Sequence, residues 1–292
     1  MRIAVLAAAN SWYLRDLARA AGGQHELTAL SYQRLASHVV GSKHLLRTGQ
    51  TELNAVDAVL VRSMPPGSLE QVVFRMDALA QLEGAGVLVV NPAKAIEVAV
   101  DKYLATARLQ GAGMLVPPTV VCQTVDEALA AFETLGGDVV VKPLFGGEGR
   151  GLTRVDDAAV ARRVFMALEQ IGAVLYVQQF IPHDGVDWRL MVIGDEVLGM
   201  KRINPDDWRT NISLGARPAP LDVTMELAQI ARRAAAAIGA SVAGVDLLPA
   251  RDGRLYAIEV NAVPGWRALA AVTGVDVADR VLNYIAHLAP GR

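Results

Sequence analysis

Residues 139–151 read Val-Val-Val-Lys-Pro-Leu-Phe-Gly-Gly-Glu-Gly-Arg-Gly, an apolar segment that ends in Lys142 and continues into a glycine-rich loop. The apolar segment predicts a buried strand over Val139–Pro143. Glycines let backbone amides close over phosphate oxygens, and the lysine adds a compact positive charge. No Gly-Lys-Ser/Thr follows the glycines, so this is not a Walker A loop. A flexible hairpin turn is the alternative, but four glycines in six positions favour a phosphate-binding loop.

Two apolar segments near the C-terminus carry Asp246, Glu259 and Asn261. They read Val-Ala-Gly-Val-Asp-Leu-Leu over 242–248 and Leu-Tyr-Ala-Ile-Glu-Val-Asn-Ala over 255–262. Side chains alternate along a strand, so Glu259 and Asn261 share a face, which Asp246 joins if the segments pair as a hairpin. Two carboxylates and an amide oxygen suit a Mg²⁺ ion that holds nucleotide phosphates. Taken alone, a solvated polar face on an edge hairpin is an equal alternative.

The first ninety or so residues alternate strands and helices, which indicates a small parallel sheet covered by helices. No Gly-x-Gly-x-x-Gly follows the first strand, so a Rossmann dinucleotide-binding domain loses its main support. The expected strands are Ile3–Ala8, Glu26–Ser31, Ala58–Arg62 and Val87–Asn91, and the expected helices are Leu14–Ala21 and Leu69–Glu83.

After this region the pattern changes to α+β, in two parts that meet near residue 180. The predicted domains are therefore 1–92, 93–178 and 179–292. The expected helices are Ala93–Gln110, Thr124–Leu135, Asp157–Gln170, Met225–Ile238 and Val277–Leu288. The expected strands are Thr119–Cys122, Val139–Pro143, Ala173–Phe180, Asp187–Ile193, Glu196–Lys201, Val242–Leu248 and Arg254–Asn261.

The composition is that of a soluble globular protein. The chain has 292 residues, 52% of them hydrophobic and 20% charged, with a formal net charge of −2. The absence of a basic excess argues against a nucleic-acid partner, and no apolar stretch is long enough to cross a membrane. A single cysteine, Cys122, excludes an intramolecular disulfide framework and indicates the reducing cytoplasm.

Three further segments carry polar residues that have either a binding role or a purely structural one, depending on what lies near them in the fold. Lys102 follows Asp101 in a predicted helix, where such a pair is usually solvated surface. Residues 175–182, Leu-Tyr-Val-Gln-Gln-Phe-Ile-Pro, can offer backbone groups to an adenine edge with Asp187 within reach of a ribose, although a plain strand is the simpler interpretation. The third segment holds four basic residues that either counter charge during phosphoryl transfer or lie scattered on a solvated sheet: Arg189, Lys201, Arg202 and Arg209.

Taken in order, these segments resemble the ATP-grasp superfamily and, within it, the RimK-like α-L-glutamate ligases. The resemblance covers essentially the whole chain and is most specific from Lys102 to Gly265. It implies an N-terminal parallel α/β (pre-ATP-grasp) lobe, a middle α+β lobe with a glycine-rich lid and a C-terminal, mainly antiparallel α+β lobe. It also implies ATP and Mg²⁺ as cofactors, with two metal ions for which Mn²⁺ can substitute.

The resemblance implies a role for individual residues. The implied metal ligands are Asp246, Glu259 and Asn261. The implied catalytic residues are Arg202, Arg209 and Asn211. The implied nucleotide contacts are Lys102, Lys142, Gly146, Gly147, Glu148, Gly149, Gly151, Gln178, Gln179, Phe180, Ile181, Asp187, Arg209, Thr210 and Asn211. One departure is Gln179, which stands where the family has glutamate; its carbonyl oxygen can still accept a hydrogen bond, so ATP binding should survive while base selectivity stays open.

The implied reaction begins when an acceptor carboxylate attacks the γ-phosphorus of ATP. The amine of L-glutamate then attacks the acylphosphate and expels phosphate. The loop after Arg62 should meet the acceptor, with the arginine either binding an anionic group or belonging to a structural Pro-Pro turn. This loop resembles ligases that act on tetrahydromethanopterin-type one-carbon cofactors, so the partners would be a small-molecule acceptor and glutamate.

Other functions remain open at this stage. The acceptor can instead be the C-terminal tail of a ribosomal protein or of an amino-group carrier protein. Some ATP-grasp proteins are small-molecule kinases, and Gln179 also allows a non-catalytic nucleotide-binding module. Members of the family often form homodimers or homotetramers, which no residue of this sequence decides.

Overall fold

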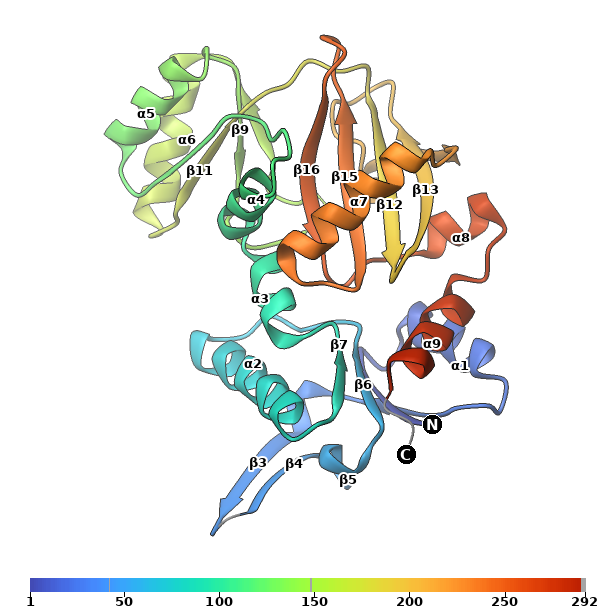
Figure 1. The fold of residues 1–292 in the computed structure, drawn as a ribbon. Coiled ribbons are helices and arrows are strands. Elements are labelled where there is room, and N and C mark those ends of the chain that lie inside the picture. The colour runs from blue at the N-terminus through green and yellow to red at the C-terminus, as the bar shows by residue number, and fades with distance from the viewer. Residues whose placement is uncertain (42, 148, 290–292) are drawn as a thin grey trace.

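The computed structural model describes residues 1–41, 43–147 and 149–289, which form three lobes (Figure 1). Alternate residues of the strands in the first lobe face opposite sides, so Val5 packs with Leu17 of one helix and Leu6 with Leu79 of another. The predicted parallel sheet is confirmed. Its strand order is β2 (Glu26–Leu30), β1 (Arg2–Leu6), β6 (Ala58–Val61) and β7 (Leu88–Val90). The two helices are α1 (Trp12–Ala21) and α2 (Leu69–Gly84).

A second, smaller sheet, absent from the elements expected from the sequence, projects from the first lobe (Figure 1). The first of its strands is partly or fully exposed along its whole length and lacks the alternation of apolar and polar residues that marks a half-buried strand. Its strands are β3 (Leu35–Val40), β4 (Lys43–Thr48) and β5 (Thr51–Glu52), flanked by the short helices η1 (Tyr32–Arg34) and η2 (Leu53–Ala55).

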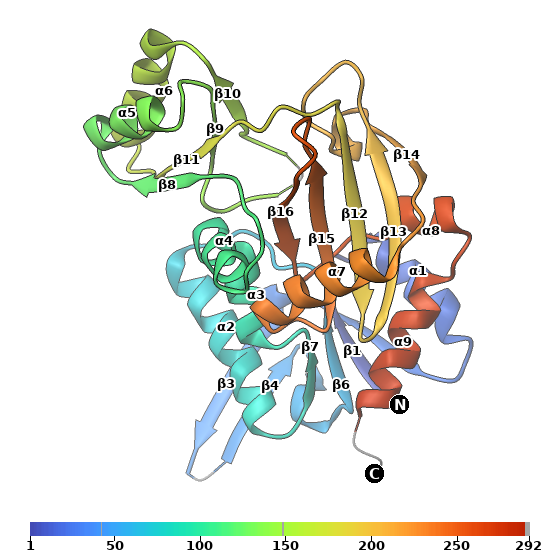
Figure 2. The same ribbon diagram turned by 45° about the horizontal axis from the view of Figure 1, so that its top comes forward.

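The middle lobe has an antiparallel sheet with two helices on its outer face (Figure 2). Its apolar core, which includes Phe132, Val141 and Phe165, forms a cluster separate from those of the other lobes. The strand order is β10 (Thr153–Val155), β9 (Val139–Lys142), β11 (Leu175–Gln179) and β8 (Thr119–Cys122). The outer helices are α5 (Val125–Thr134) and α6 (Ala158–Gln170).

The single helix predicted over Ala93–Gln110 is wrong, because the structure divides it into α3 (Ala93–Val100) and α4 (Lys102–Gly111). Asp101 adopts an extended conformation, with φ −90° and ψ 103°, and its carboxylate accepts a hydrogen bond from Leu104 N at 3.0 Å. Aspartate competes for backbone amides in this way and therefore favours a helix N-cap over a helix interior. The break starts α4 at Lys102.

The C-terminal lobe is an antiparallel sheet covered by α7 (Met225–Ile238). Its strand order is β14 (Arg217–Pro220), β13 (Glu196–Ile203), β12 (Val186–Ile193), β15 (Val242–Pro249) and β16 (Leu255–Asn261). The short helices η3 (Ile212–Leu214) and α8 (Arg267–Thr273) were not predicted. The last helix, α9 (Val277–Leu288), returns to the first lobe and packs against α1, where Arg19 pairs with Asp276 at 2.8 Å.

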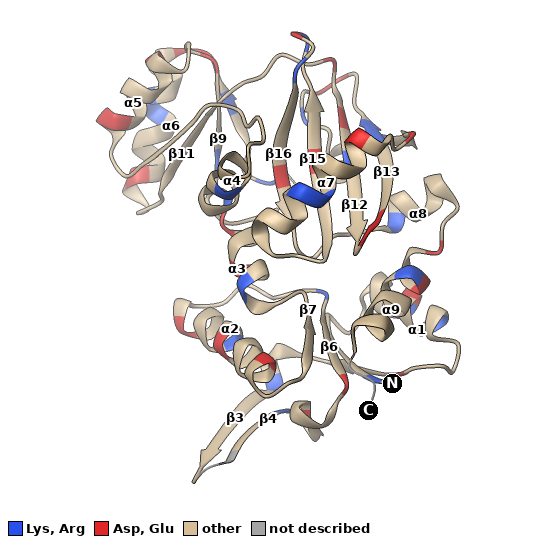
Figure 3. Ribbon diagram, in the orientation of Figure 1, with Lys and Arg blue, Asp and Glu red and all other residues tan. Residues whose placement is uncertain are grey.

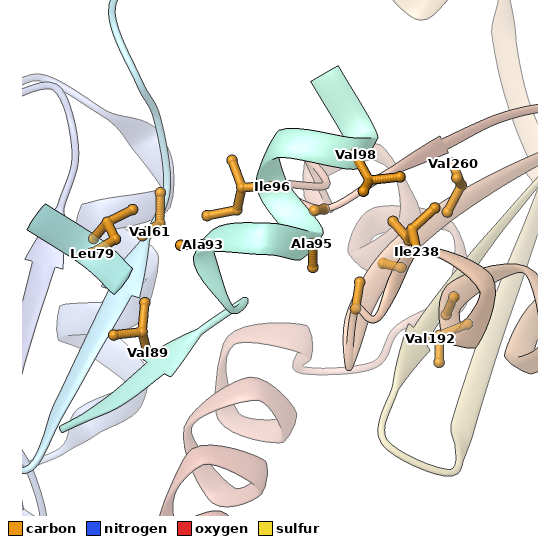
Figure 4. Packing of buried hydrophobic residues seen from close by; sticks show 14 of the residues in the cluster. Val61, Leu79, Val89, Ala93, Ala95, Ile96, Val98, Val192, Ile238 and Val260 are labelled. Atoms are coloured by element: carbon orange, nitrogen blue, oxygen red, sulfur yellow. The ribbon is translucent and has the colours of Figure 1, made fainter. Parts of the chain in front are cut away.

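Helix α3 and Asn91, two residues before it, join the first lobe to the C-terminal lobe. Figure 4 shows Val61 and Leu79 on one side of α3 and Ile238 and Val260 on the other, all within one apolar cluster. The buried side chain of Asn91 adds polar contacts to this junction. Its amide nitrogen donates to the carbonyls of Val242 (2.7 Å) and Ala262 (2.6 Å), and its oxygen accepts from the amides of Ser241 (2.8 Å) and Val242 (2.9 Å).

Lys and Arg are interspersed with Asp and Glu over the three lobes (Figure 3). Within residues 1–41, 43–147 and 149–289, no helix has both the length and the apolar character that crossing a bilayer requires.

Replacing Asn91 by alanine should lower the free energy of unfolding by roughly 2–4 kcal/mol, because buried carbonyl and amide groups of the C-terminal lobe lose their partners. Urea denaturation followed by circular dichroism measures the change. Asn283→Ala is the matched control: its exposed amide donates to Asp279 within α9, and its loss should stay near 0.5 kcal/mol or below. Equal losses in both variants would contradict the role given to Asn91.

Candidate active site

A cleft between the middle and C-terminal lobes brings together most of the site residues predicted from the sequence. These are Lys102, Lys142, Gly146, Gly147, Gly149, Gln178, Gln179, Phe180, Ile181, Asp187, Arg202, Arg209, Thr210, Asn211, Asp246 and Glu259. Gly151 and Asn261 do not line this cleft. Glu148 lies outside the described residues.

The predicted hairpin that carries the acidic residues is confirmed. β15 and β16 pair in a register that sets Asp246 opposite Glu259 and Gly244 opposite Asn261. The two carboxylates are therefore cross-strand neighbours, and Asn261 follows two residues along the same face of β16. The Asn261 Oδ1 accepts a hydrogen bond from Val263 N at 2.8 Å, which orients the amide toward the loop after the strand.

Two arginines neutralise the buried carboxylate of Asp246. Arg189 Nε lies 2.5 Å from one carboxylate oxygen, and Arg202 Nη2 lies 2.9 Å from the other. Arg202 also holds both carboxylate oxygens of Asp187, and Thr210 Oγ1 donates to Asp187 at 2.7 Å. Strand register explains these contacts, because Asp187 pairs with Arg202 and Arg189 with Asp246. The result is an alternating chain of charges across β12, β13 and β15.

Burial and pairing act in opposite directions on these groups. Burial raises the pKa of Asp187, although the guanidinium of Arg202 acts to lower it. Burial also disfavours the charged form of Arg202, but the carboxylates of Asp246 and Asp187 outweigh it and raise the pKa of Arg202. Arg202 thus stays charged between two acids, which excludes a solvated sheet face as the explanation for this residue.

The predicted basic cluster separates into two groups in the structure. Arg189 and Arg202 contact the carboxylates on the floor of the cleft. Arg209 also lines the cleft, but it pairs with Asp207 of its own loop at 2.6 Å. Lys201 is not among the cleft-lining residues.

Two lysines face Glu259, Lys142 from the end of β9 in the middle lobe and Lys102 from the start of α4. Burial lowers the pKa of Lys142 to about 8, partly offset by the charge of Glu259 and reinforced by that of Lys102. Burial also lowers the pKa of Lys102, whose Nζ donates to the carbonyl of Gly146 at 2.7 Å. In the described part of the chain, Lys142 Nζ has no hydrogen bond or ion pair, and the Tyr176 ring centroid lies 5.9 Å away. An unpaired ammonium group on a half-buried side chain that lines the cleft is suited to a phosphate.

The glycine loop reaches from these lysines to the C-terminal lobe. Gly149 has a φ of +74°, and a Cβ at this position would collide with Oδ1 of Asn211. Only glycine allows both this backbone conformation and this close approach. The loop is therefore held by Lys102 at Gly146 and lies against Asn211 at Gly149, so it lines the cleft from one lobe to the other.

The other end of the cleft is less charged. Gln178 is buried and donates from Nε2 to Thr119 Oγ1 at 2.8 Å and to the Tyr176 hydroxyl at 3.2 Å. Gln179 extends toward Gly136 instead. The apolar residues that line this end are Val140, Ile181, Leu248 and Ile258. Thr119 and Tyr176 were missed in the sequence, although the alternation along β11 places Tyr176 on the same face as Gln178.

Arg62 lies away from this cleft, at the contact between the first lobe and the segment after β16. Its guanidinium is 4.2 Å from the centroid of the Trp266 ring and 4.9 Å from that of Tyr13. Its Nη2 donates to the carbonyl of Pro264 at 2.7 Å. The side chain is buried, which lowers its pKa to about 10. These contacts support the structural alternative for the Arg62 loop.

Both parts of the chain match models of known families. Residues 1–96 match the RimK PreATP-grasp domain and residues 99–285 match the RimK-like ATP-grasp domain. The chain is 30% identical to the tetrahydromethanopterin:alpha-L-glutamate ligase of Methanosarcina acetivorans, over 96% of each protein. It is 29% identical to the glutamate–LysW ligase ArgX of Sulfolobus acidocaldarius, over 80% of this chain and 83% of the relative.

A solved structure supports the same grouping. The RimK domain protein ATP-grasp from Sphaerobacter thermophilus has a TM-score of 0.75 and 25% identity, over 97% of this chain and 99% of that one. The three lobes, with lysines and a glycine loop opposite a carboxylate pair, are the arrangement of the ATP-grasp class. Together with the family models, they show that the chain belongs to the RimK-like ATP-grasp family.

Replacing Arg202 by methionine should destabilise the protein by roughly 3–5 kcal/mol at pH 8, because Asp187 and Asp246 lose their shared cation in a buried site. Burial raises the pKa of Asp187 already in the parent, and the variant loses the guanidinium that acts to lower it. Protonation of Asp187 as the pH falls relieves part of the cost, so the loss should be smaller at pH 5.

Urea denaturation at both pH values measures the effect. The control is Arg251→Met, which removes an exposed pair with Asp184 and should change stability little at either pH. A loss in the Arg202 variant that is independent of pH would contradict the assignment of the buried acids as its cause.

Proposed function

We propose that this protein is an ATP- and Mg²⁺-dependent ligase that activates an acceptor carboxylate as an acylphosphate and joins it to the amine of L-glutamate. The observation that carries the proposal is the cleft itself, in which Lys102 and Lys142 face the paired carboxylates of Asp246 and Glu259. Phosphates fit between the lysines, and a hard divalent cation fits the oxygen donors opposite. Membership of the RimK-like family and the names of its ligase relatives support the same reaction.

The phosphate end of the cleft is assigned as follows. Lys102 and Lys142 bind phosphate oxygens of ATP. The fit for Mg²⁺ rests on the donor set, with Asp246, Glu259 and Asn261 supplying carboxylate and amide oxygens, and the bound ion would neutralise charge on the phosphates. Asn261 Oδ1 keeps a lone pair beyond its bond to Val263 N, so the oxygen remains available as a ligand.

The remaining residues stabilise and protect the reacting groups. The acceptor carboxylate attacks the γ-phosphorus to give the acylphosphate and ADP; the glutamate amine then attacks the acyl carbon and releases phosphate. Arg202 and Arg209 stabilise charge on the transferring phosphoryl group and on the tetrahedral oxyanion. The glycine loop, seated on Asn211 through Gly149, excludes water that would hydrolyse the acylphosphate.

The acceptor we propose is a small molecule of the tetrahydromethanopterin type. Its support is the similarity to the ligase of that name, which extends over nearly the full length of both proteins. A carrier protein is the second candidate, because the chain is also similar to a ligase named for the protein LysW.

The ligase assignment predicts that ADP and phosphate form only when acceptor, glutamate and Mg²⁺ are all present. The assay uses labelled glutamate with ATP and either a tetrahydromethanopterin-type pterin or a LysW-type carrier protein, and mass spectrometry identifies the labelled product. Glu259→Gln is the matched variant: it keeps the shape of the side chain, removes one ligand charge and should reduce turnover by at least about a hundredfold. A stable phosphorylated acceptor formed without glutamate would replace the ligase by a kinase.

The low pKa of Lys142 predicts a pH-dependent contribution to nucleotide binding. Lys142 in the free protein loses its proton as the pH rises through about 8, so its attraction for phosphate is present at pH 7 and lost at pH 9.5. Lys142→Met should weaken ADP binding at pH 7 by roughly tenfold or more and by much less at pH 9.5.

Isothermal titration calorimetry at the two pH values measures both affinities. Comparing the variant with the parent at each pH gives the difference in affinity that the Lys142 side chain makes. A ratio of parent to variant affinity that does not fall between pH 7 and pH 9.5 would argue against a phosphate contact by Lys142.

A further inference from the structure

The side chain of Gln178 is held in one orientation at the uncharged end of the cleft. The residue is 3% exposed and lines the cleft from β11, opposite Val140 of β9 and Thr119 of β8. It lies two residues from the position opposite Lys142, about 7 Å along the strand. This distance separates Gln178 from the phosphate end and places it where the base of a bound nucleotide would lie.

A chain of hydrogen bonds decides which end of the amide faces the cleft. Thr119 Oγ1 donates its single proton to the carbonyl of Pro117 at 2.8 Å. The hydroxyl oxygen can therefore only accept from Gln178, so the atom 2.8 Å away must be the amide nitrogen. The second proton of Nε2 points toward the Tyr176 hydroxyl at 3.2 Å. The carbonyl of Pro117 can only accept a hydrogen bond, so it determines the direction of the whole chain. The positions of the oxygen and nitrogen in the Gln178 amide are therefore determined by the hydrogen bonds.

The amide oxygen is left as an acceptor for a ligand. Within the described chain no hydrogen bond reaches Gln178 Oε1, and this oxygen is not one of the fully buried polar atoms without a partner. It therefore reaches the open part of the cleft. Turning the amide over would set its oxygen against the lone pairs of Thr119 Oγ1, which is unfavourable. The surrounding side chains, Ile181, Leu248 and Ile258, are apolar, so an unmatched donor or acceptor on the ligand would remain unpaired there.

We infer that Gln178 determines base selectivity, with its Oε1 accepting a hydrogen bond from the exocyclic 6-amino group of a purine, and that Thr119 enforces this selectivity by fixing the amide. A 6-oxo purine presents an acceptor at the same position and is rejected. Gln179, which replaces the acid of the family pattern, extends toward Gly136 and does not set the preference. This inference rests on the proposed binding of ATP in the cleft.

The test measures the affinities of ADP and inosine diphosphate by calorimetry, without acceptor or glutamate. The two nucleotides differ at position 6 of the base and in the N1 proton, and they share the ribose and phosphates. The parent should prefer ADP by roughly tenfold or more, the effect of one buried hydrogen bond. Thr119→Val frees the amide to turn over and should reduce this preference to near unity, whereas Thr119→Ser keeps the hydroxyl and should retain it.

Two further variants separate the neighbouring glutamines. Gln178→Leu removes the acceptor while keeping much of the volume, so ADP should lose affinity and the preference should disappear. Gln179→Leu should leave the preference unchanged. An unaltered preference in Thr119→Val and Gln178→Leu, or its loss in Gln179→Leu, would overturn the inference and leave the ligase proposal standing. A parent protein that does not bind ADP at all would instead overturn the proposed function and, with it, this inference.

Discussion

The floor of the cleft depends on one guanidinium group, that of Arg202, held between the buried carboxylates of Asp187 and Asp246. Burying any one of these charges alone would carry a large desolvation cost, and the attraction between neighbouring opposite charges offsets that cost. Because Arg189 continues the alternation on Asp246, the side chains of three neighbouring strands are fixed to one another. The position of the acidic pair therefore follows from strand register and charge pairing, before any ligand binds.

The first and C-terminal lobes share one apolar core, whereas the middle lobe has a separate one. One apolar cluster runs from the first lobe through α3 into the C-terminal lobe, and the buried amide of Asn91 binds the same junction. The middle lobe has an apolar cluster of its own. Its contacts at the cleft include the seat of Gly149 on Asn211. A C-terminal lobe packed together with the first lobe, and a middle lobe with a core of its own, are suited to enclosing a nucleotide between them.

The sequence predicted what depends on local periodicity and missed what depends on distant partners. Alternation along two strands was enough to place Glu259 beside Asp246, because strand geometry leaves few alternatives. The hairpin at Leu35–Thr48 escaped prediction because β3 is partly or fully exposed along its whole length, and β4 buries side chains at Leu46 and Thr48, near its end. Asp101 ended a helix through a single capping bond that the surrounding apolar pattern obscured. The partners of Arg62 could not be read from sequence at all, since Pro264 lies 202 residues away.

Arg62 also changes what the first lobe contributes to the site. Its guanidinium rests on Trp266 and holds the carbonyl of Pro264, and a Cβ at Gly265 would collide with the hydroxyl of Tyr13. Through these contacts the first lobe holds the segment that follows β16. The amide of Asn261 is oriented toward the start of that segment by its hydrogen bond with Val263 N. An arginine committed to these contacts is not available to bind an anionic acceptor. The first lobe therefore supports the acidic end of the cleft from behind, and recognition of the acceptor must depend on other residues around the cleft.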